Sequence, residues 1–125
     1  MFGLPPLLFG TAARTGAPLW LSEAVATFTL LLTIFGGLRY APQAVPWLVG
    51  LVITAAYWFT ASTSFANPAV TLARGFTTTF SGIAINHVPG FIVAQLIGAI
   101  LAAALAAKLF PANAAHRVEV MAPGE

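Results

Sequence analysis

The residues with the greatest chemical potential lie in one short uncharged stretch, where Asn67, Pro68 and Ala69 form an Asn-Pro-Ala tripeptide. Asn is favourable at the N-cap of a helix and Pro at its first position, so a helix is predicted from residue 68. The start of such a helix has free N–H groups and a partial positive charge. If it faces an aqueous path, the Asn amide donates to a water or hydroxyl oxygen, and the positive charge repels cations. These properties suit a pore that admits water and rejects protons; the structural alternative is an ordinary helix cap.

The composition defines the environment in which this tripeptide would act. Hydrophobic residues make up 59% of the 125 residues and charged residues only 6%, whereas about 25% of an average soluble domain is charged. Too few polar groups are present to cover a water-facing surface, so the sequence predicts an integral membrane protein. The 5 basic residues are scattered, which argues against nucleic-acid binding. With no cysteine, 3 acidic residues and 2 histidines without partners at ligand spacing, we expect no enzyme activity, no metal and no cofactor.

Three segments are long and apolar enough to position the tripeptide within a bilayer, which takes about 20 residues per helix. They are residues 19–38, 45–62 and 88–110. Residues 63–82, between the second and the third, are too short and interrupted to span. We predict a re-entrant loop followed by a half-helix of about three turns, because irregular backbone at membrane depth must be buried in protein or line a watery cavity. The predicted fold is an all-α membrane protein with three transmembrane helices plus one re-entrant half-helix.

The two ends of the chain complete the predicted organisation. Residues 1–16 are interpreted as the end of a truncated helix and an extracytoplasmic loop, and residues 112–125 as a polar C-terminal tail. The positive-inside rule places Arg39, Lys108 and Arg117 in the cytoplasm, with Arg14 outside. The predicted orientation in the cell membrane therefore has the N-terminus outside and the C-terminus in the cytoplasm.

The order of the motifs resembles the aquaporin and glycerol-facilitator channels, the major intrinsic protein family. The resemblance covers residues 19–110 and rests on "SEAVATF", "GLVITAAYW", "NPAVTLA" and "AQLIGA". It implies a fold of two inverted repeats, each with three spans and one half-helix, whose two Asn-Pro-Ala loops meet at the pore centre. This chain has one such loop and so resembles one repeat. The charge distribution favours the C-terminal repeat, although "NPAVT" and "AQLIGA" are typical of a first repeat.

The resemblance also implies roles for individual side chains. Glu23, one turn inside the first span, would brace the re-entrant loop by accepting backbone N–H bonds; the alternative is a Glu at the membrane interface. The family has an Arg three residues after the Asn, where this chain has Val70, and Arg74 lies one turn further on. Arg74 either reaches back toward the path or extends to the outer interface. Tyr57 would contribute to the same constriction, or belong to an interfacial aromatic belt with Trp58.

Further residues are expected to line the path or to pack the helices. Ser64 and Phe65 would offer backbone carbonyls to a file of solute, given an extended loop. Gln95 is expected to hydrogen-bond between helices. Small residues four apart in the third span are expected to allow close helix packing, with an oligomer contact as the alternative. This small-residue seam consists of Gly90, Ala94, Gly98, Ala102 and Ala106.

Together these features predict a subunit or fragment of a passive channel for water and small neutral solutes such as glycerol, urea or metalloid hydroxides. The absence of a cation at residue 70 favours a wider constriction than that of a strict water channel. Expected partners are the lipid bilayer and a complementary first-half repeat, and a family-like homotetramer is compatible with the sequence. The alternative is a truncated, non-conducting remnant that needs a missing first half. Antiparallel pairing of two copies is a third possibility, which the charge bias opposes.

Overall fold

The computed structural model describes residues 8–111. This part of the chain is helical and contains no strand, which confirms the all-α class. Three of its helical segments are long and apolar enough to cross a membrane: Ala17–Tyr40, Pro42–Phe59 and Ile85–Leu109. The elements are α1 (Ala17–Tyr40), a 3-10 turn (Pro42–Ala44), α2 (Val45–Phe59), the short α3 (Pro68–Arg74), a second 3-10 turn (Ile85–His87) and α4 (Val88–Leu109).

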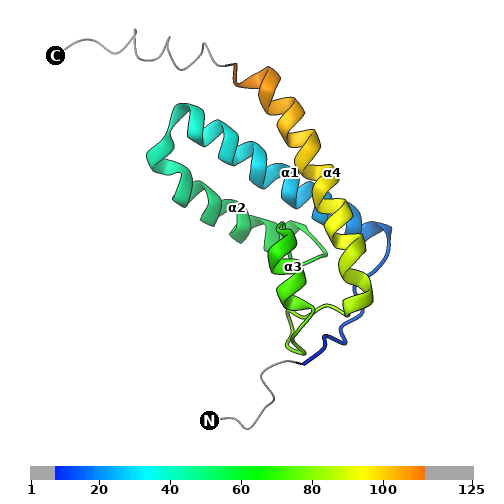
Figure 1. The fold of residues 1–125 in the computed structure, drawn as a ribbon. Helices are drawn as coiled ribbons and strands as arrows, with labels where there is room; N and C mark the ends of the chain where they lie inside the picture. The colour runs from blue at the N-terminus through cyan, green and yellow to red at the C-terminus, as the bar shows by residue number, and fades with distance from the viewer. Residues whose placement is uncertain (1–7, 112–125) are drawn as a thin grey trace, which may run out of the picture.

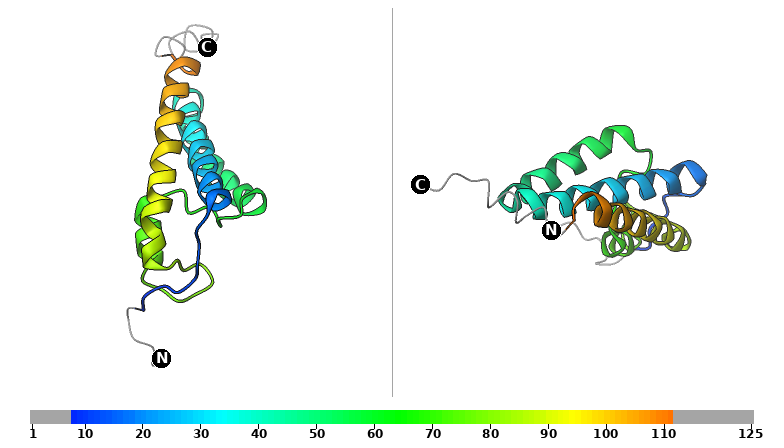
Figure 2. Two further views of the ribbon diagram at one scale, coloured as in Figure 1. Left: turned by 90° about the vertical axis from the view of Figure 1, so that its right-hand side faces the viewer. Right: turned by 90° about the horizontal axis from the view of Figure 1, so that it is seen from above.

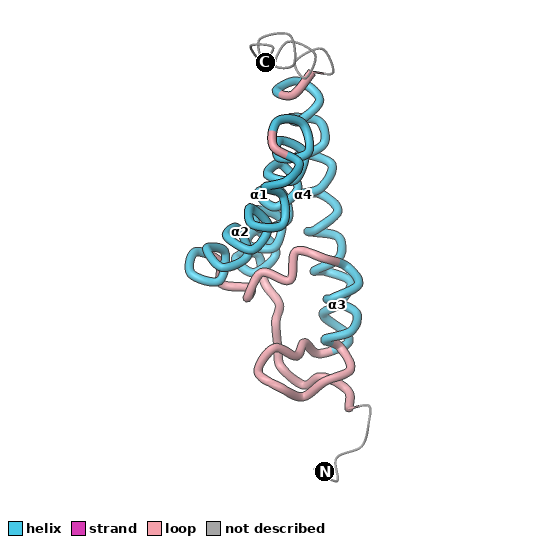
Figure 3. The backbone as a smooth tube through the Cα atoms, turned by 90° about the vertical axis from the view of Figure 1, so that its left-hand side faces the viewer, coloured by secondary structure: helices cyan, strands magenta, loops and turns pink. Residues whose placement is uncertain are grey.

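The helices form a hairpin crossed by a third long helix. In Figure 1, α1 and α2 run side by side in opposite directions, α4 lies along α1, and α3 lies beside the first part of α4. The views in Figure 2 show the same arrangement from the side and from above. In Figure 3 the long loops gather around α3 at one end, whereas the short α1–α2 connection and the end of α4 lie at the other. The first and the last described residues therefore lie at opposite ends of the helix bundle (Figure 1 and Figure 3).

The half-helix and the second span are shorter than predicted. The prediction of about three turns was wrong: α3 has 7 residues, because the N–H of Gly75 bonds to the carbonyls of Thr71 and Leu72 and the chain then turns away. The second span ends at Phe59 rather than at residue 62. There the hydroxyl of Thr60 donates to the carbonyl of Ala56 at 2.7 Å, and the backbone of Thr60 is extended rather than helical.

The small-residue seam of α4 packs against α1. Ala94, Gly98, Ala102 and Ala106 are buried within the chain. A Cβ atom added at Gly98 would lie 2.3 Å from the carbonyl oxygen of Ala24, so glycine lets the two backbones touch. The seam thus faces another helix of the same chain rather than a neighbouring subunit.

Residues 8–15 are extended and cover the loops next to α3. The N–H of Gly10 donates to the carbonyl of Gly75 at 2.8 Å, and the carbonyl of Ala12 accepts from Ala84 at 2.8 Å. The truncated helix predicted within residues 1–16 does not appear in residues 8–16, and residues 1–7 lie outside the described residues, as do the predicted tail 112–125 and Arg117. The extended segment matters because it delivers Arg14 to the site.

Candidate pore-lining site

The site is built around the buried carboxylate of Glu23 on α1, which has no exposed surface. Its Oε1 atom accepts from the hydroxyl of Ser62 at 2.7 Å and from the N–H of Phe65 at 2.8 Å. Its Oε2 atom accepts from the N–H of Ala66 at 2.9 Å and from Nε2 of Gln95 at 2.7 Å. Four donors from the loop and from α4 therefore replace the water that this carboxylate loses on burial.

Gln95 on α4 connects this carboxylate to α3. Its Nε2 atom also donates to Oγ1 of Thr71 at 2.7 Å, and Thr71 in turn donates to the carbonyl of Asn67 at 2.9 Å. Gln95 and Thr71 are both buried. One continuous chain of hydrogen bonds thus runs from α1 through α4 to the first residue of the Asn-Pro-Ala tripeptide.

Asn67 caps α3 and keeps one donor free. Its backbone is extended, and its Oδ1 atom accepts from the N–H groups of Ala69 at 2.8 Å and Val70 at 3.3 Å. Two backbone donors at this atom identify it as the amide oxygen, which leaves Nδ2 as the outward group. No acceptor for Nδ2 occurs among residues 8–111, and Asn67 and the two following residues of the tripeptide are exposed. A solute at this surface therefore meets a hydrogen-bond donor.

The segment before the tripeptide, residues 62–66, is here called the carbonyl loop. The extended backbone expected at Ser64 and Phe65 was wrong in detail: Thr63, Ser64 and Ala66 have φ angles of 65°, 49° and 47°. Left-handed backbone at a residue other than glycine costs about 1–3 kcal/mol, so the bonds to Glu23 must hold the loop in place. Within residues 8–111, no hydrogen bond reaches the carbonyl oxygens of residues 63–66. These oxygens therefore have no hydrogen-bond partner in that part of the chain, and Ser64, Phe65 and Ala66 themselves are largely buried.

Phe65 joins the carbonyl loop to the apolar core. Its side chain is buried with Ile83, Val88 and Phe91, and its ring centroid lies 5.4 Å from that of Phe91. Val70 packs against the same cluster while remaining half-exposed. The side chain at this position therefore contributes to the core as well as to the surface beside the tripeptide.

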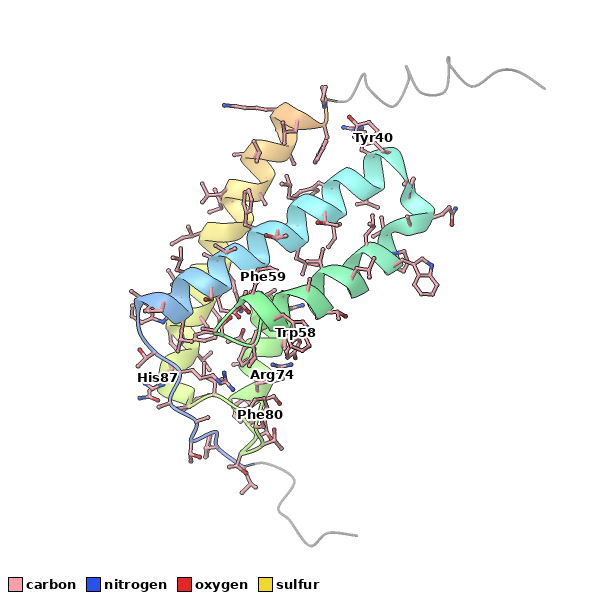
Figure 4. All side chains as sticks on the ribbon, turned by 180° about the vertical axis from the view of Figure 1, so that it is seen from behind. Tyr40, Trp58, Phe59, Arg74, Phe80 and His87 are labelled. Atoms are coloured by element: carbon pink, nitrogen blue, oxygen red, sulfur yellow. The ribbon has the colours of Figure 1, made fainter. Side chains whose placement is uncertain are left out.

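Two arginines lie over the ring of Phe65. The Cζ atom of Arg74 is 4.3 Å from the ring centroid and that of Arg14 is 5.6 Å away, both within the range of cation–π contacts. The Nη1 atom of Arg74 is buried without a partner in the described part of the chain. Figure 4 shows Arg74, Phe80 and His87 at the same end of the molecule, with Tyr40 at the other. Arg74 therefore lies beside the carbonyl loop rather than extending away from it.

Arg14 is the site residue that the sequence analysis missed. Its guanidinium donates to the carbonyl of Ser62 at 3.4 Å, of Phe80 at 2.8 Å and of Gly82 at 2.9 Å. Burial lowers the pKa of Arg14 from its ordinary value, and the charge of Arg74 acts in the same direction. The ordinary value is high enough that the group remains a cation at neutral pH. No spacing in the sequence marks this role, because the three hydrogen bonds of the guanidinium go to backbone carbonyls distant along the chain.

The remaining predicted site residues divide between two locations. Tyr57, near the end of α2, is 48% exposed and lies close enough to Arg14 to raise the pKa of that group. Trp58 is 89% exposed beside it. Gly90 lies on α4 away from the tripeptide, where an added Cβ would be 2.8 Å from the indole nitrogen of Trp20. The structure thus brings Tyr57 near the arginines, whereas Gly90 belongs to helix packing.

Comparison with known proteins identifies the relatives of this chain. Residues 20–124 match the major intrinsic protein family. Over 105 residues the chain is 64% identical to aquaglyceroporin AqpS of Rhizobium meliloti (strain 1021), and the match covers 84% of this chain and 45% of that protein. The chain thus spans somewhat less than half the length of the curated relative that it matches. No solved structure matches with statistical significance.

The family match and the three long apolar helices both indicate a membrane protein. The match covers most of the chain, including the three long apolar segments and the Asn-Pro-Ala tripeptide. The chain is a multi-pass membrane protein that belongs to the major intrinsic protein family, a family of membrane channels and not of enzymes.

Proposed function

We propose that this chain is one repeat of a passive membrane channel for water and small neutral solutes. The observation that carries the proposal is the carbonyl loop, whose oxygens at residues 63–66 accept no hydrogen bond from residues 8–111. The free Nδ2 donor of Asn67 follows directly in the chain. A row of acceptors next to a donor can replace the hydration of a hydroxylated solute as it passes. Family membership supports the same function.

Glycerol and similar solutes are the proposed cargo. The relative from Rhizobium meliloti is named an aquaglyceroporin, which supports glycerol as a solute here. Val70 stands where the resemblance calls for a cationic constriction residue, and its side chain packs against the core at Phe65. A constriction without that cation is wider and less polar. It therefore suits glycerol, urea or metalloid hydroxides as well as water.

A complementary repeat is the proposed partner. On α2 only Ala56 is buried, while Trp47, Leu51 and Trp58 are more than 60% exposed. Lipid can cover such apolar side chains, but it offers no acceptor to the exposed amide of Asn67. We infer that a first-half repeat covers Asn67 in the conducting form. Water would then fill the path between the two repeats. A homotetramer of complete channels is compatible with this arrangement.

The proposed orientation places the N-terminus outside and the C-terminus in the cytoplasm. Arg39 and Lys108 lie at the end where α4 finishes, and Arg39 donates to the carbonyl of Phe110 at 3.1 Å. Arg14 and Arg74 lie together at the opposite end. Because each end carries two of these cations, the excess of positive charge at the cytoplasmic end depends on Arg117 in the tail.

We expect a reporter fused to the C-terminus to be found on the cytoplasmic face only. A reporter outside would reverse the orientation, and one on both faces would support antiparallel pairs.

The channel proposal is tested by Asn67→Asp. We define the joined channel as this chain linked, in the order of the relative's sequence, to the portion of aquaglyceroporin AqpS that it does not match. Asp is as good an N-cap as Asn, so α3 should persist. The substitution removes the Nδ2 donor and adds a negative charge. We expect glycerol permeability, followed by light scattering of liposomes, to fall at least about tenfold.

Asn86→Asp is the matched control, because Asn86 is an exposed asparagine in the second 3-10 turn. Its permeability should equal that of the unsubstituted joined channel. Conduction by this chain alone would show that it assembles into a pore without another repeat. Conduction only by the joined channel would identify a half-channel. If neither conducts with the protein verifiably inserted, the channel proposal is wrong and the chain is a non-conducting remnant.

A further inference from the structure

We propose that Arg14 is a positioning residue that sets which solutes the channel admits, by fixing the carbonyl loop together with Glu23. This role rests on the proposed channel function. The segment that carries Arg14 lies outside the membrane-spanning helices and outside the Asn-Pro-Ala tripeptide. Its side chain nevertheless reaches the residues that the proposed path uses.

The carbonyl loop is held by two groups of opposite charge. Glu23 accepts from its N–H groups at Phe65 and Ala66. Arg14 donates to its first carbonyl, at Ser62, and its guanidinium lies 5.6 Å from the ring centroid of Phe65. A carboxylate can satisfy only donors and a guanidinium only acceptors, so neither group can take over the other's role. Both are required to fix the backbone that bears the free carbonyls.

Arg14 also ties the carbonyl loop to the segment that follows α3. Two of its nitrogens donate to the carbonyls of Phe80 and Gly82, at 2.8 Å and 2.9 Å. The backbone at Gly82 is closely packed, since a Cβ added there would lie 2.3 Å from the carbonyl oxygen of Thr77. The planar guanidinium thus bridges the segments before and after the half-helix. The packing of Phe65 against Ile83 joins the same two segments, and Arg14 adds the polar connection between them.

The backbone of Arg14 is anchored as well. Its N–H donates to Nδ1 of His87 at 3.2 Å, immediately before α4 begins. The neighbouring Ala12 accepts from the N–H of Ala84 at 2.8 Å. The guanidinium therefore projects from an anchored backbone, which limits how far it can follow the carbonyl loop if that loop moves. This is the property expected of a group that sets a distance.

The first measurement uses the full chain in lipid nanodiscs and follows amide hydrogen exchange. Arg14→Gln removes the charge and the planar fork, and Gln cannot span three carbonyls. We expect exchange at Phe65 and Ala66 to accelerate about tenfold, since their bonds to Glu23 will open more often. Arg39→Gln is the matched control, because within residues 8–111 the side chain of Arg39 makes one hydrogen bond, to the carbonyl of Phe110 at the opposite end. Unchanged exchange in Arg14→Gln would overturn the positioning role.

The second measurement compares glycerol with a larger linear polyol, such as sorbitol, in the joined channel. A general loss of stability would lower both permeabilities equally. Loss of the bridge should instead change their ratio, with sorbitol permeability rising relative to glycerol by about fivefold or more in Arg14→Gln. Arg14→Lys retains the charge but not the fork, so its ratio should lie between those of the unsubstituted channel and Arg14→Gln.

The outcomes separate this inference from the channel proposal. An unchanged ratio in Arg14→Gln, with glycerol still permeating, would overturn the selectivity role alone. Absence of all permeation in the unsubstituted joined channel would overturn the channel proposal and the selectivity role together. In that case hydrogen exchange still decides whether Arg14 positions the carbonyl loop.

Discussion

Replacing Glu23 with Gln is expected to abolish solute permeation and to lower the free energy of unfolding by about 3 kcal/mol or more. All four partners of the carboxylate act as donors toward it: the hydroxyl of Ser62, the N–H groups of Phe65 and Ala66, and Nε2 of Gln95. An amide supplies one acceptor oxygen and one donor nitrogen. At least one backbone N–H, that of Phe65 or that of Ala66, would therefore face another donor, and the strained backbone of the carbonyl loop would lose support.

Thermal unfolding in detergent and glycerol flux through the joined channel measure the two effects of Glu23→Gln. Ser22→Ala is the control on the adjacent residue, because among the described residues the hydroxyl of Ser22 makes one long bond, accepting from the N–H of Ala61 at 3.3 Å. It should change the melting temperature and the flux little. A Glu23→Gln protein with normal flux and an unchanged melting temperature would contradict the bracing role proposed for this carboxylate.

Gly98→Ala is the second substitution with a large expected effect. The added Cβ would approach the carbonyl oxygen of Ala24 to 2.3 Å, and no rotamer change can relieve a contact with backbone. Overpacking of this kind costs about 1–3 kcal/mol. Since Ala24 follows Glu23 and Gln95 lies one turn before Gly98, separation of α1 from α4 would also stretch the bond between Gln95 and Glu23. We therefore expect a lower melting temperature together with reduced flux.

Gly50→Ala provides the matched comparison for Gly98→Ala. Gly50 also lies within a predicted span, but a Cβ added there would meet no atom of residues 8–111 within 4 Å. Alanine has a higher helix propensity than glycine, so this variant should be at least as stable as the unsubstituted protein. Equal melting temperatures for the two variants would show that α1 and α4 do not pack as tightly as described.

The helices followed directly from the sequence because apolar length is a local property. The spans predicted at residues 19–38 and 88–110 correspond to α1 at Ala17–Tyr40 and α4 at Val88–Leu109. The start of α3 at Pro68 was also predictable, since the capping preference of Asn and the fixed φ angle of Pro act on adjacent residues. The end of α3 was not, because residues 75–84 bond to the segment around Gly10 and Ala12, far away in the chain.

The site, like the helices, has features that the local sequence predicts and features that depend on distant parts of the chain. The sequence indicated Glu23, Gln95 and the tripeptide, but not the hydrogen bonds that join Gln95 to Glu23 and to Thr71. Thr71, which connects Gln95 to Asn67, has no distinguishing feature in the sequence, although it lies one turn after Asn67. Arg14 was predicted only as a topology signal, whereas the structure places its guanidinium on three backbone carbonyls. Backbone acceptors are present at every residue, so no pattern of side chains can reveal which of them a distant arginine will meet.

The sequence by itself determined that this chain is an all-helical membrane protein with an Asn-Pro-Ala helix start, because hydrophobicity and capping depend on residue type and near neighbours. Only the tertiary structure decided how the carbonyl loop is held and what α4 packs against. A buried carboxylate must find donors wherever the fold brings them, and for Glu23 these lie 39 to 72 residues away along the chain. The left-handed backbone at Thr63, Ser64 and Ala66 follows from those bonds and not from the local sequence.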